Sequence, residues 1–236
     1  MSILRWLPED WKDRVRRRAG AVTERERLRN LGRAGFRPLH ILDGGAFRGE
    51  WSRLARAAFP DSRLLLVEPQ PSLTAHLESV AREIGNASVE AVAIGRNPGE
   101  ANLLLQETNT RIVGGEGVTD AKVARVAVAT LESLLGSRSF TDACLLKLDL
   151  QGHELEALHG AGSWFGRAEV ILVETSWLRI GDVPIVEEVL KVFAERHYVP
   201  YDIFNLRYRP RDSALWQADV VFVRSGSVLL KSRSWS

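Results

Sequence analysis

Short apolar runs alternate with stretches of helical periodicity along most of the chain. The apolar runs, which predict strands, are Leu39–Leu42, Arg63–Val67, Ser88–Ala93, Ala143–Leu148, Glu169–Glu174, Pro200–Phe204 and Leu215–Val223. Helical periodicity lies between most of them, at Glu50–Ala58, Pro71–Ile84, Glu154–Leu158 and Pro184–Arg196. Strands separated by helices predict βαβ crossovers and a largely parallel sheet.

Two departures from this alternation refine the predicted topology. Only the loop Asn205–Ala214 separates the last two predicted strands, so we expect an antiparallel hairpin at that edge. Asn102–Gln106 and Val123–Ala129 predict an additional strand pair, joined by a loop rich in glycine (Gly114, Gly115, Gly117). The expected fold is therefore α/β and Rossmann-like, with a seven-stranded, mostly parallel sheet, helices on both faces and a C-terminal antiparallel hairpin.

Composition places this sheet in a single ordinary globular domain. The chain has 236 residues, of which 45% are hydrophobic. No apolar run approaches the roughly 18 residues of a membrane-spanning helix, and the first residues lack a signal-peptide core. The single cysteine, Cys144, has no partner for an internal disulfide. We therefore expect a soluble, cytoplasmic protein.

Charge separates the N-terminus from the rest of the chain. Residues 1–37 contain 11 Lys/Arg and 5 Asp/Glu, so they carry +6 and the remainder, 38–236, carries −4. Trp11, Val15 and Val22 fall near one helical stripe, which predicts a basic helical arm in front of the domain. Such an arm indicates contact with an anionic partner, such as a membrane surface, a nucleotide-linked substrate or nucleic acid, unless it is simply a solvated helical face.

In an open α/β sheet, ligands bind beyond the carboxyl ends of the strands, so polar residues there are candidates. The first strand ends in Asp43, Gly44 and Gly45, followed by Ala46 and Gly49. This spacing is not the G-x-G-x-x-G of dinucleotide binding, which disfavours a nicotinamide-linked oxidoreductase. Asp43 would repel a pyrophosphate but suits a ligand ammonium group. The alternative is an ordinary turn with Asp43 as a helix cap.

The next two strand ends supply the remaining parts of an adenosine site. Glu68 closes the second strand, where a carboxylate can accept hydrogen bonds from both ribose hydroxyls, and Pro69 follows it. Ala93 and Ile94, at the end of the third, are small and apolar enough to pack on an adenine face. Together with Asp43, these features predict S-adenosylmethionine, which carries an ammonium, a carboxylate and a sulfonium but no phosphate.

The same segments resemble a known family. In order and spacing, LDGGAFRGEWS, VEP, AIG, TLESL, LLKLDLQGHELEALHGA and VILVE are similar to the motifs of the FkbM family of S-adenosylmethionine-dependent methyltransferases. The resemblance covers roughly residues 28–224 and departs at Gly44, Phe47 and Gln151, where Val, Asn and Glu are common. It implies a class I methyltransferase fold and O-methylation, usually of a sugar or polyketide-type hydroxyl.

The fourth strand end supplies the candidates for catalysis. A neutral alcohol is a poor nucleophile, and a positioned base assists it, most often a histidine. We therefore expect His153 to be the base and Asp149 to orient it or to contact the cofactor. Glu154 is a further candidate for catalysis or acceptor binding. A purely structural role for His153 and Glu154, in the first turn of a helix, stays open. Lys147 is expected to pair with a carboxylate, either Asp149 or Glu174.

The acceptor is less well defined. Polar and aromatic residues in the last hairpin suit a sugar or an anionic acceptor (Asn205, Arg207, Tyr208, Arg209, Trp216). No metal is predicted, because the clustered Asp and Asn that magnesium favours are missing from the strand ends. The predicted reaction is methyl transfer by in-line displacement to a hydroxyl of a sugar, glycan or secondary metabolite.

Two alternatives are kept beside this reaction. A nucleic-acid methyltransferase that uses the basic arm is disfavoured, because LDLQG stands where many such enzymes carry an Asn/Asp-Pro-Pro-aromatic motif. The arm also lacks interleaved aromatic residues for base stacking. The second alternative is a non-catalytic module that keeps the cofactor cleft. The sequence determines neither the acceptor nor the oligomeric state.

Overall fold

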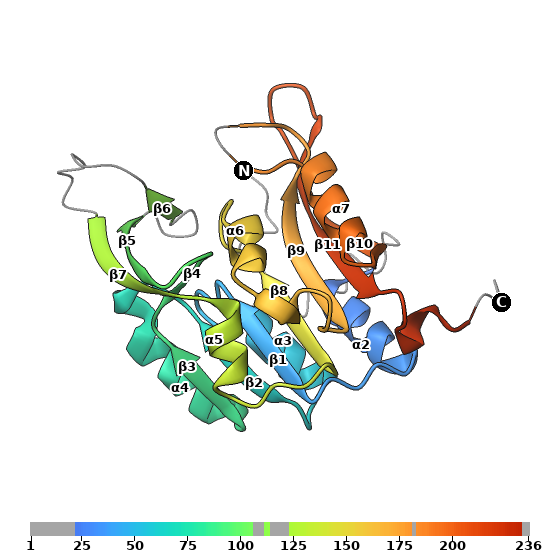
Figure 1. The fold of residues 1–236 in the computed structure, drawn as a ribbon, viewed down its shortest axis with the longest axis horizontal. Coiled ribbons are helices and arrows are strands. Elements are labelled where there is room, and N and C mark those ends of the chain that lie inside the picture. The colour runs from blue at the N-terminus through green and yellow to red at the C-terminus, as the bar shows by residue number, and fades with distance from the viewer. Residues whose placement is uncertain (1–21, 106–110, 114–122, 181–182, 233–236) are drawn as a thin grey trace, which may run out of the picture.

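The computed structural model describes residues 22–105, 111–113, 123–180 and 183–232 (Figure 1). Its main sheet has seven strands in the order β10-β11-β9-β8-β1-β2-β3. Their bounds are β1 (His40–Gly44), β2 (Arg63–Val67), β3 (Ala87–Glu90), β8 (Cys144–Leu148), β9 (Val170–Ser176), β10 (Tyr198–Tyr208) and β11 (Leu215–Arg224). Neighbouring strands are parallel except that β11 runs antiparallel to β9 and β10. The predicted α/β fold, its seven-stranded sheet and its C-terminal hairpin are confirmed.

Helices cover both faces of this sheet (Figure 1). One face carries α2 (Glu24–Arg33), α3 (Glu50–Ala58) and α4 (Thr74–Ile84), and the other carries α5 (Leu131–Gly136), α6 (Glu154–His159) and α7 (Val186–Glu195). Short 3-10 helices lie at η2 (Pro71–Leu73), η4 (Gly162–Trp164) and η5 (Val228–Leu230). Side chains alternate between the faces along each strand, so Ile41 packs with the first group of helices and Leu42 with the second.

The predicted strand Ser88–Ala93 is split between two sheets. β3 ends at Glu90, and Ala93 opens β4 (Ala93–Ile94) in a separate four-stranded sheet, of order β4-β7-β5-β6. Its other strands are β5 (Gly99–Leu104), β6 (Arg111–Val113) and β7 (Val123–Ala129). Apolar periodicity over Ser88–Ala93 suits either sheet, and only the pairing of Ala93 with Val128 decides between them.

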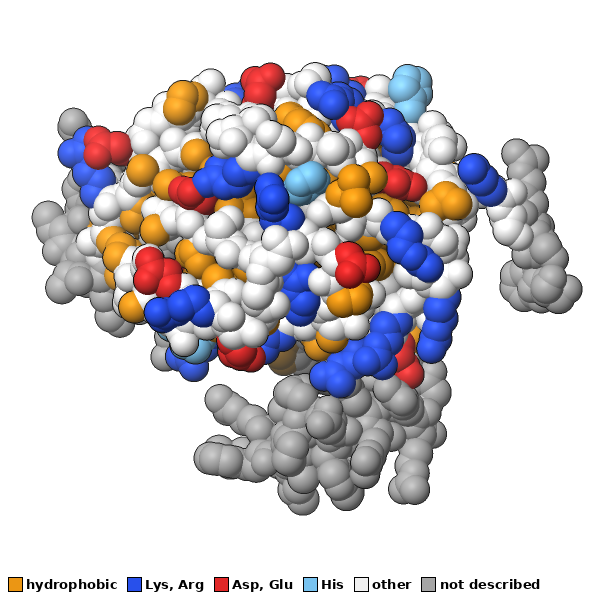
Figure 2. All heavy atoms as spheres, turned by 90° about the horizontal axis from the view of Figure 1, so that it is seen from below, with side chains coloured by type: hydrophobic (Ala, Val, Ile, Leu, Met, Phe, Trp, Pro, Cys, Tyr) orange, Lys and Arg blue, Asp and Glu red, His pale blue; other side chains and the backbone are white. Residues whose placement is uncertain are grey.

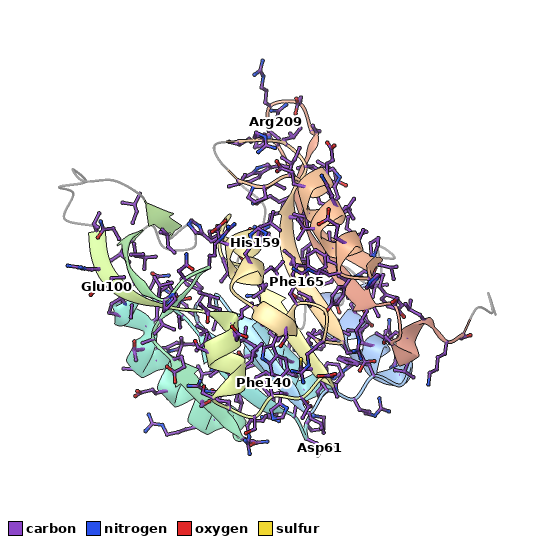
Figure 3. The ribbon with its side chains drawn as sticks, viewed as in Figure 1. Asp61, Glu100, Phe140, His159, Phe165 and Arg209 are labelled. Atoms are coloured by element: carbon purple, nitrogen blue, oxygen red, sulfur yellow. The ribbon has the colours of Figure 1, made fainter. Side chains whose placement is uncertain are left out.

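The predicted additional strand pair is confirmed as part of this smaller sheet. β5 and β7 pair antiparallel, from Gly99 opposite Val128 to Leu104 opposite Val123. Gln106 and the glycines of the loop (Gly114, Gly115, Gly117) lie outside the described residues. The C-terminal hairpin is longer than expected, since β10 continues to Tyr208. Irregular pairing between Phe204 and Arg207 accompanies this extension, and Arg209 lies at the hairpin tip (Figure 3).

The described part of the N-terminal segment packs against the domain. Thr23 and Glu26 form a capping box that begins α2, and Leu28 and Leu31 are buried. Arg27 forms an ion pair with Asp202 of β10. Residues 1–21, including Trp11 and Val15, lie outside the described residues, so a basic arm over 1–37 stays a prediction. No helix among the described residues is long and apolar enough to cross a membrane.

Surface charges on the underside of the molecule are mixed in sign. Figure 2 shows Lys and Arg side chains interspersed with Asp and Glu side chains on this face. Several of the surface charges form ion pairs, such as Arg167 with Asp142 at 2.8 Å. Exposed pairs of this kind contribute at most about 1 kcal/mol to stability, so packing of the two hydrophobic layers carries most of the fold.

Gly45 brings β1 and β8 together at their carboxyl ends. It follows β1 with a φ of 72°, and its backbone lies against the carbonyl of Asp149, which follows β8. A Cβ atom at this position would overlap the Asp149 carbonyl oxygen. The turn therefore accepts only glycine without a shift of one strand end.

We expect the G45A variant to lose at least about 3 kcal/mol of unfolding free energy, because it adds a backbone clash to a left-handed φ. G85A is the control, since Gly85 also has a positive φ, at 67°, but no described residue lies near its Cβ position. Gly85 combines this φ with a ψ of 159°, a conformation that costs other residues roughly 1–3 kcal/mol, so G85A should lose less than G45A. Urea denaturation measures both, and equal losses would contradict the role of close packing at Gly45.

Candidate active site

A cavity of about 350 Å³ lies at the carboxyl ends of β1, β2 and β8, beside the small sheet. Seven of the predicted site residues line it: Gly45, Glu68, Pro69, Ala93, Ile94, Asp149 and His153. Five others do not, namely Asp43, Gly44, Ala46, Gly49 and Glu154. The volume is that of a small-molecule site. The strand ends predicted to form the site thus meet at one cavity. Several of the predicted residues lie behind the lining rather than on it.

Glu68 is held rigidly at the end of β2. Its Oε2 accepts a hydrogen bond from the Phe47 backbone N–H at 2.8 Å, and its Oε1 accepts one from the Gln70 backbone N–H at 3.0 Å. The side chain is buried, and burial raises its pKa although these hydrogen bonds oppose the shift. Each carboxylate oxygen keeps a lone pair for a further donor, so Glu68 can accept from two neighbouring hydroxyls.

The small sheet forms an apolar part of the cavity wall. Ala93 and Ile94 of β4 line the cavity as predicted, and Leu103 of β5 and Ile112 of β6 join them. Leu103 and Ile112 were not predicted as site residues from the sequence. The one available signal was the apolar alternation of the extra strand pair, which did not indicate that this pair folds over the cofactor side. An apolar wall beside a buried carboxylate fits an aromatic base joined to a ribose.

Asp43 lies under the cavity wall rather than on it. Its side chain is 1% exposed, its Oδ2 accepts a hydrogen bond from Ser52 Oγ at 2.6 Å, and its Oδ1 lies 3.0 Å from Lys147 Nζ. The expected pairing of Lys147 with Asp149 or Glu174 is thus only partly right: Asp43 is its nearest carboxylate, and Asp149 follows at 3.7 Å. Direct contact between Asp43 and a ligand ammonium stays a prediction, while Asp149, unlike Asp43, lines the cavity.

The other three predicted residues of the glycine turn also support the wall. Gly44 ends β1, where a Cβ would press on Ile94 and Leu148, and Ala46 is buried. Gly49 is the N-cap of α3 and lies against α4. Their contribution to a cofactor site is the shape of the turn, and any contact with a ligand stays a prediction.

Polar groups at the end of β8 form a connected chain. Asp149 Oδ1 accepts a hydrogen bond from Gln151 Nε2 at 2.7 Å, and the same nitrogen lies 3.5 Å from Glu174 Oε2. Glu174, at the end of β9, accepts from Arg207 at 2.7 Å. Gln151 and Arg207 also line the cavity. The side of the cavity that faces the hairpin is thus rich in carboxylate, amide and guanidinium groups.

Glu174 is the buried centre of this polar side. Burial raises its pKa to about 8, helped by the nearby charge of Asp149 and opposed by Arg207. Gln217 Nε2 lies 3.4 Å from the same carboxyl group. These partners fix Arg207, whose side chain is half exposed, in one place above the cavity.

His153 lines the cavity at the start of α6. Its Nδ1 is buried and has no hydrogen-bond partner among the described residues, and burial lowers the pKa of the imidazole below its ordinary value. The Glu156 charge opposes this shift only in part. The ring is therefore neutral near pH 7 and able to take a proton.

Glu154 faces the loop instead of the cavity. Its Oε1 accepts hydrogen bonds from the backbone N–H groups of Leu150, at 2.7 Å, and Gly152, at 3.2 Å. The side chain is 4% exposed, and burial raises its pKa to about 7. Glu154 thus holds the loop that presents Asp149 and His153. A direct catalytic role for Glu154 stays a prediction that no contact with the cavity supports.

The fold and site together define a class I methyltransferase. The main sheet places a buried acid, Glu68, and a tight glycine turn at one cavity, and the small sheet adds an apolar wall. Among the described residues, Arg207 is the one Lys or Arg side chain on its lining, so the cavity does not suit a pyrophosphate. Nor does any group of three or more His, Cys, Asp or Glu in the described part of the chain form a metal site.

Comparison with known families identifies the chain more closely. The model of the methyltransferase FkbM domain matches residues 43–200. The chain belongs to the FkbM methyltransferase family and carries an S-adenosylmethionine-dependent methyltransferase domain. The resemblance noted in the sequence is thereby confirmed. No functionally curated protein matches the chain.

Two solved structures share the fold. A methyltransferase FkbM from Methylobacillus flagellatus KT is 18% identical with a TM-score of 0.50, over 78% of this chain and 43% of that one. EvdMO1 is 13% identical with a TM-score of 0.50, over 86% of this chain and 41% of that one. This chain therefore spans less than half the length of either protein.

The residues of the cavity fit S-adenosylmethionine. Glu68 would hold the ribose hydroxyls, and Ala93, Ile94 and the apolar wall would pack on the adenine. Asp149 is a carboxylate on the lining that suits the methionine ammonium group. The backbone of Gly45 leaves room for a close approach. This match rests on charge: the two carboxylates on the lining, Glu68 and Asp149, favour a cationic ligand and disfavour a phosphate.

The raised pKa of Glu154 makes stability depend on pH. The folded protein binds the Glu154 proton more tightly than the unfolded chain does, so this contribution stabilises the fold at low pH and is lost as pH rises through about 7. We expect the unfolding free energy to fall between pH 5 and pH 8, and E154Q to remove roughly 1–3 kcal/mol of that fall.

Urea denaturation at both pH values measures this change. E156Q, at the surface of the same helix, is the control and should keep the wild-type dependence. An unchanged pH dependence in E154Q would show that the Glu154 carboxyl is ionised throughout this range.

Proposed function

We propose that this chain methylates a hydroxyl group of a sugar, glycan or secondary metabolite. The observation that carries the proposal is the position of His153, a neutral imidazole on the cavity lining beside Asp149. Such a base is suited to an alcohol, whose oxygen becomes a good nucleophile as its proton leaves. The family resemblance, which implies O-methylation, supports the same reaction.

The described side chains divide the work of this reaction. S-adenosylmethionine supplies an electrophilic methyl group on its sulfonium. His153 accepts the hydroxyl proton of the acceptor, and Glu154 fixes the loop that carries His153. Gln151, on the acceptor side of the cavity, is held in one arrangement by its hydrogen bond to Asp149 on the cofactor side. Orientation of this kind supplies a large part of the rate of bimolecular transfers.

Polar groups facing the hairpin support an acceptor with several hydroxyls. Gln151 and Arg207 present amide and guanidinium groups on the cavity lining. Planar groups of these types hydrogen-bond to neighbouring hydroxyls. A nucleic-acid acceptor would call for several phosphate contacts from Lys and Arg, and the described lining offers only Arg207. The acceptor we propose is accordingly a small molecule or glycan.

A labelled-methyl transfer assay tests the proposed acceptor class. The chain is incubated with methyl-labelled S-adenosylmethionine and, separately, with sugars and glycans, secondary-metabolite extracts, RNA and DNA. We expect label on a hydroxyl of a sugar, glycan or metabolite, as an ether that resists alkali. Label on nucleic acid would contradict the proposal, and tight binding of S-adenosylhomocysteine without any transfer would indicate a non-catalytic module.

Matched variants test whether transfer depends on this cavity. E68Q should lower the initial rate at limiting cofactor by about tenfold, because it removes a ribose acceptor worth about 1.4 kcal/mol. E90Q, at the end of the neighbouring strand β3 and outside the cavity, should keep the wild-type rate. Equal rates in both variants would place the cofactor elsewhere.

His153 variants test the proposed base. With the acceptor found above, H153A and H153Q should lower kcat by about 10²–10⁴ while the Kd for S-adenosylhomocysteine stays within about twofold. H159A, on the surface of the same helix, is the control.

The pH profile gives a second measurement of the same role. Because burial lowers the His153 pKa, kcat/KM of the wild type should hold down to pH 6.5 and fall only below it. That fall should be missing in H153A. Full activity of H153A would remove the histidine from the reaction.

A further inference from the structure

Lys147 is a buried charge among apolar neighbours. It lies on β8 directly opposite Asp43 of β1, and its side chain is 8% exposed. Ile41, Leu145 and Leu172 occupy the same face of the sheet and are fully or almost fully buried. Burial of an ammonium costs several kcal/mol, so an apolar residue would suit packing alone better. The contacts of the ammonium therefore explain why a lysine lies here.

These contacts join two strand ends at the cavity. Lys147 Nζ lies 3.0 Å from Asp43 Oδ1, 3.0 Å from the carbonyl oxygen of Gly45 and 3.7 Å from Asp149 Oδ2. Gly45 and Asp149 line the cavity from different strands, whereas Lys147 and Asp43 lie behind them. Trp51 covers the ammonium from the helix side, 5.9 Å from its ring centre.

The ammonium stays charged in this position. Burial acts to lower its pKa, but the carboxylates of Asp43 and Asp149 outweigh burial and hold the pKa above the ordinary value. Ser52 Oγ fixes the other oxygen of Asp43. Asp43 is thus a fixed counter-charge for the ammonium. The ammonium also binds two groups of the cavity wall, the Gly45 carbonyl oxygen and the Asp149 carboxylate.

We propose that Lys147 is a positioning residue for the cofactor: its ammonium sets the Gly45 carbonyl and the Asp149 carboxylate where S-adenosylmethionine meets them. This proposal rests on the cofactor of the family and is independent of the acceptor. Lys147 would thus control the conformation of the cavity wall that meets the cofactor, although Lys147 does not itself line the cavity.

The competing explanation is that Lys147 only neutralises Asp43. The double variant D43N/K147M separates the two explanations, because it removes both charges and leaves neither buried alone. We expect its Tm to stay close to that of the wild type, while the Kd for S-adenosylhomocysteine, measured by calorimetry, rises at least about tenfold. D43N alone keeps the ammonium on the wall and should raise this Kd by no more than about threefold.

Two further variants complete the test. K147R keeps a positive charge opposite Asp43, but its longer planar group cannot reproduce both wall contacts, so the Kd should rise at least about threefold. S52A removes the other partner of Asp43 and should leave the Kd within about twofold of the wild type. Wild-type affinity in either Lys147 variant that folds would overturn the proposal, as would a D43N loss equal to that of the double variant.

Discussion

The close approach of β1 and β8 at their carboxyl ends determines where everything else in the site lies. Gly45 lies against the carbonyl of Asp149, and the Lys147 ammonium links the same two segments from below. Because the two strands are parallel neighbours, their ends point to one edge of the sheet. The turn after β1 and the loop after β8 therefore form adjacent walls of one cavity.

Buried carboxyl groups give this edge its chemistry. Glu68, Glu154 and Glu174 are nearly inaccessible to water, and burial raises the pKa of each. They differ in what surrounds them: backbone N–H groups hold Glu68 and Glu154, while a guanidinium and two amides surround Glu174. Similar side chains thus serve different ends: Glu68 lines the cavity, Glu154 supports a loop, and Glu174 anchors Arg207.

The sequence predicts the sheet and the strand-end residues well, and the small sheet poorly. Period-two and helical patterns are strong in the core, so the strands that end in Asp43, Glu68 and Asp149 were identified with nearly correct bounds. Ala93 was assigned to the wrong sheet, and Leu103 and Ile112 were missed, because pairing between distant segments decides both. Nor does spacing show that Asp43 turns away from the cavity toward Ser52 and Lys147.

The polar run after β8 shows how one short loop separates roles that the sequence leaves together. Gln151 and Gly152 both have positive φ, at 54° and 97°, so the chain turns sharply between Asp149 and His153. A left-handed residue other than glycine costs roughly 1–2 kcal/mol, and the bond from Gln151 to Asp149 helps to offset it. Glu154 binds the backbone inside the turn, which leaves Asp149 and His153 facing the cavity. The acid nearest the histidine in sequence is thus committed to the loop, so the proposed proton transfer depends on an imidazole whose pKa burial lowers.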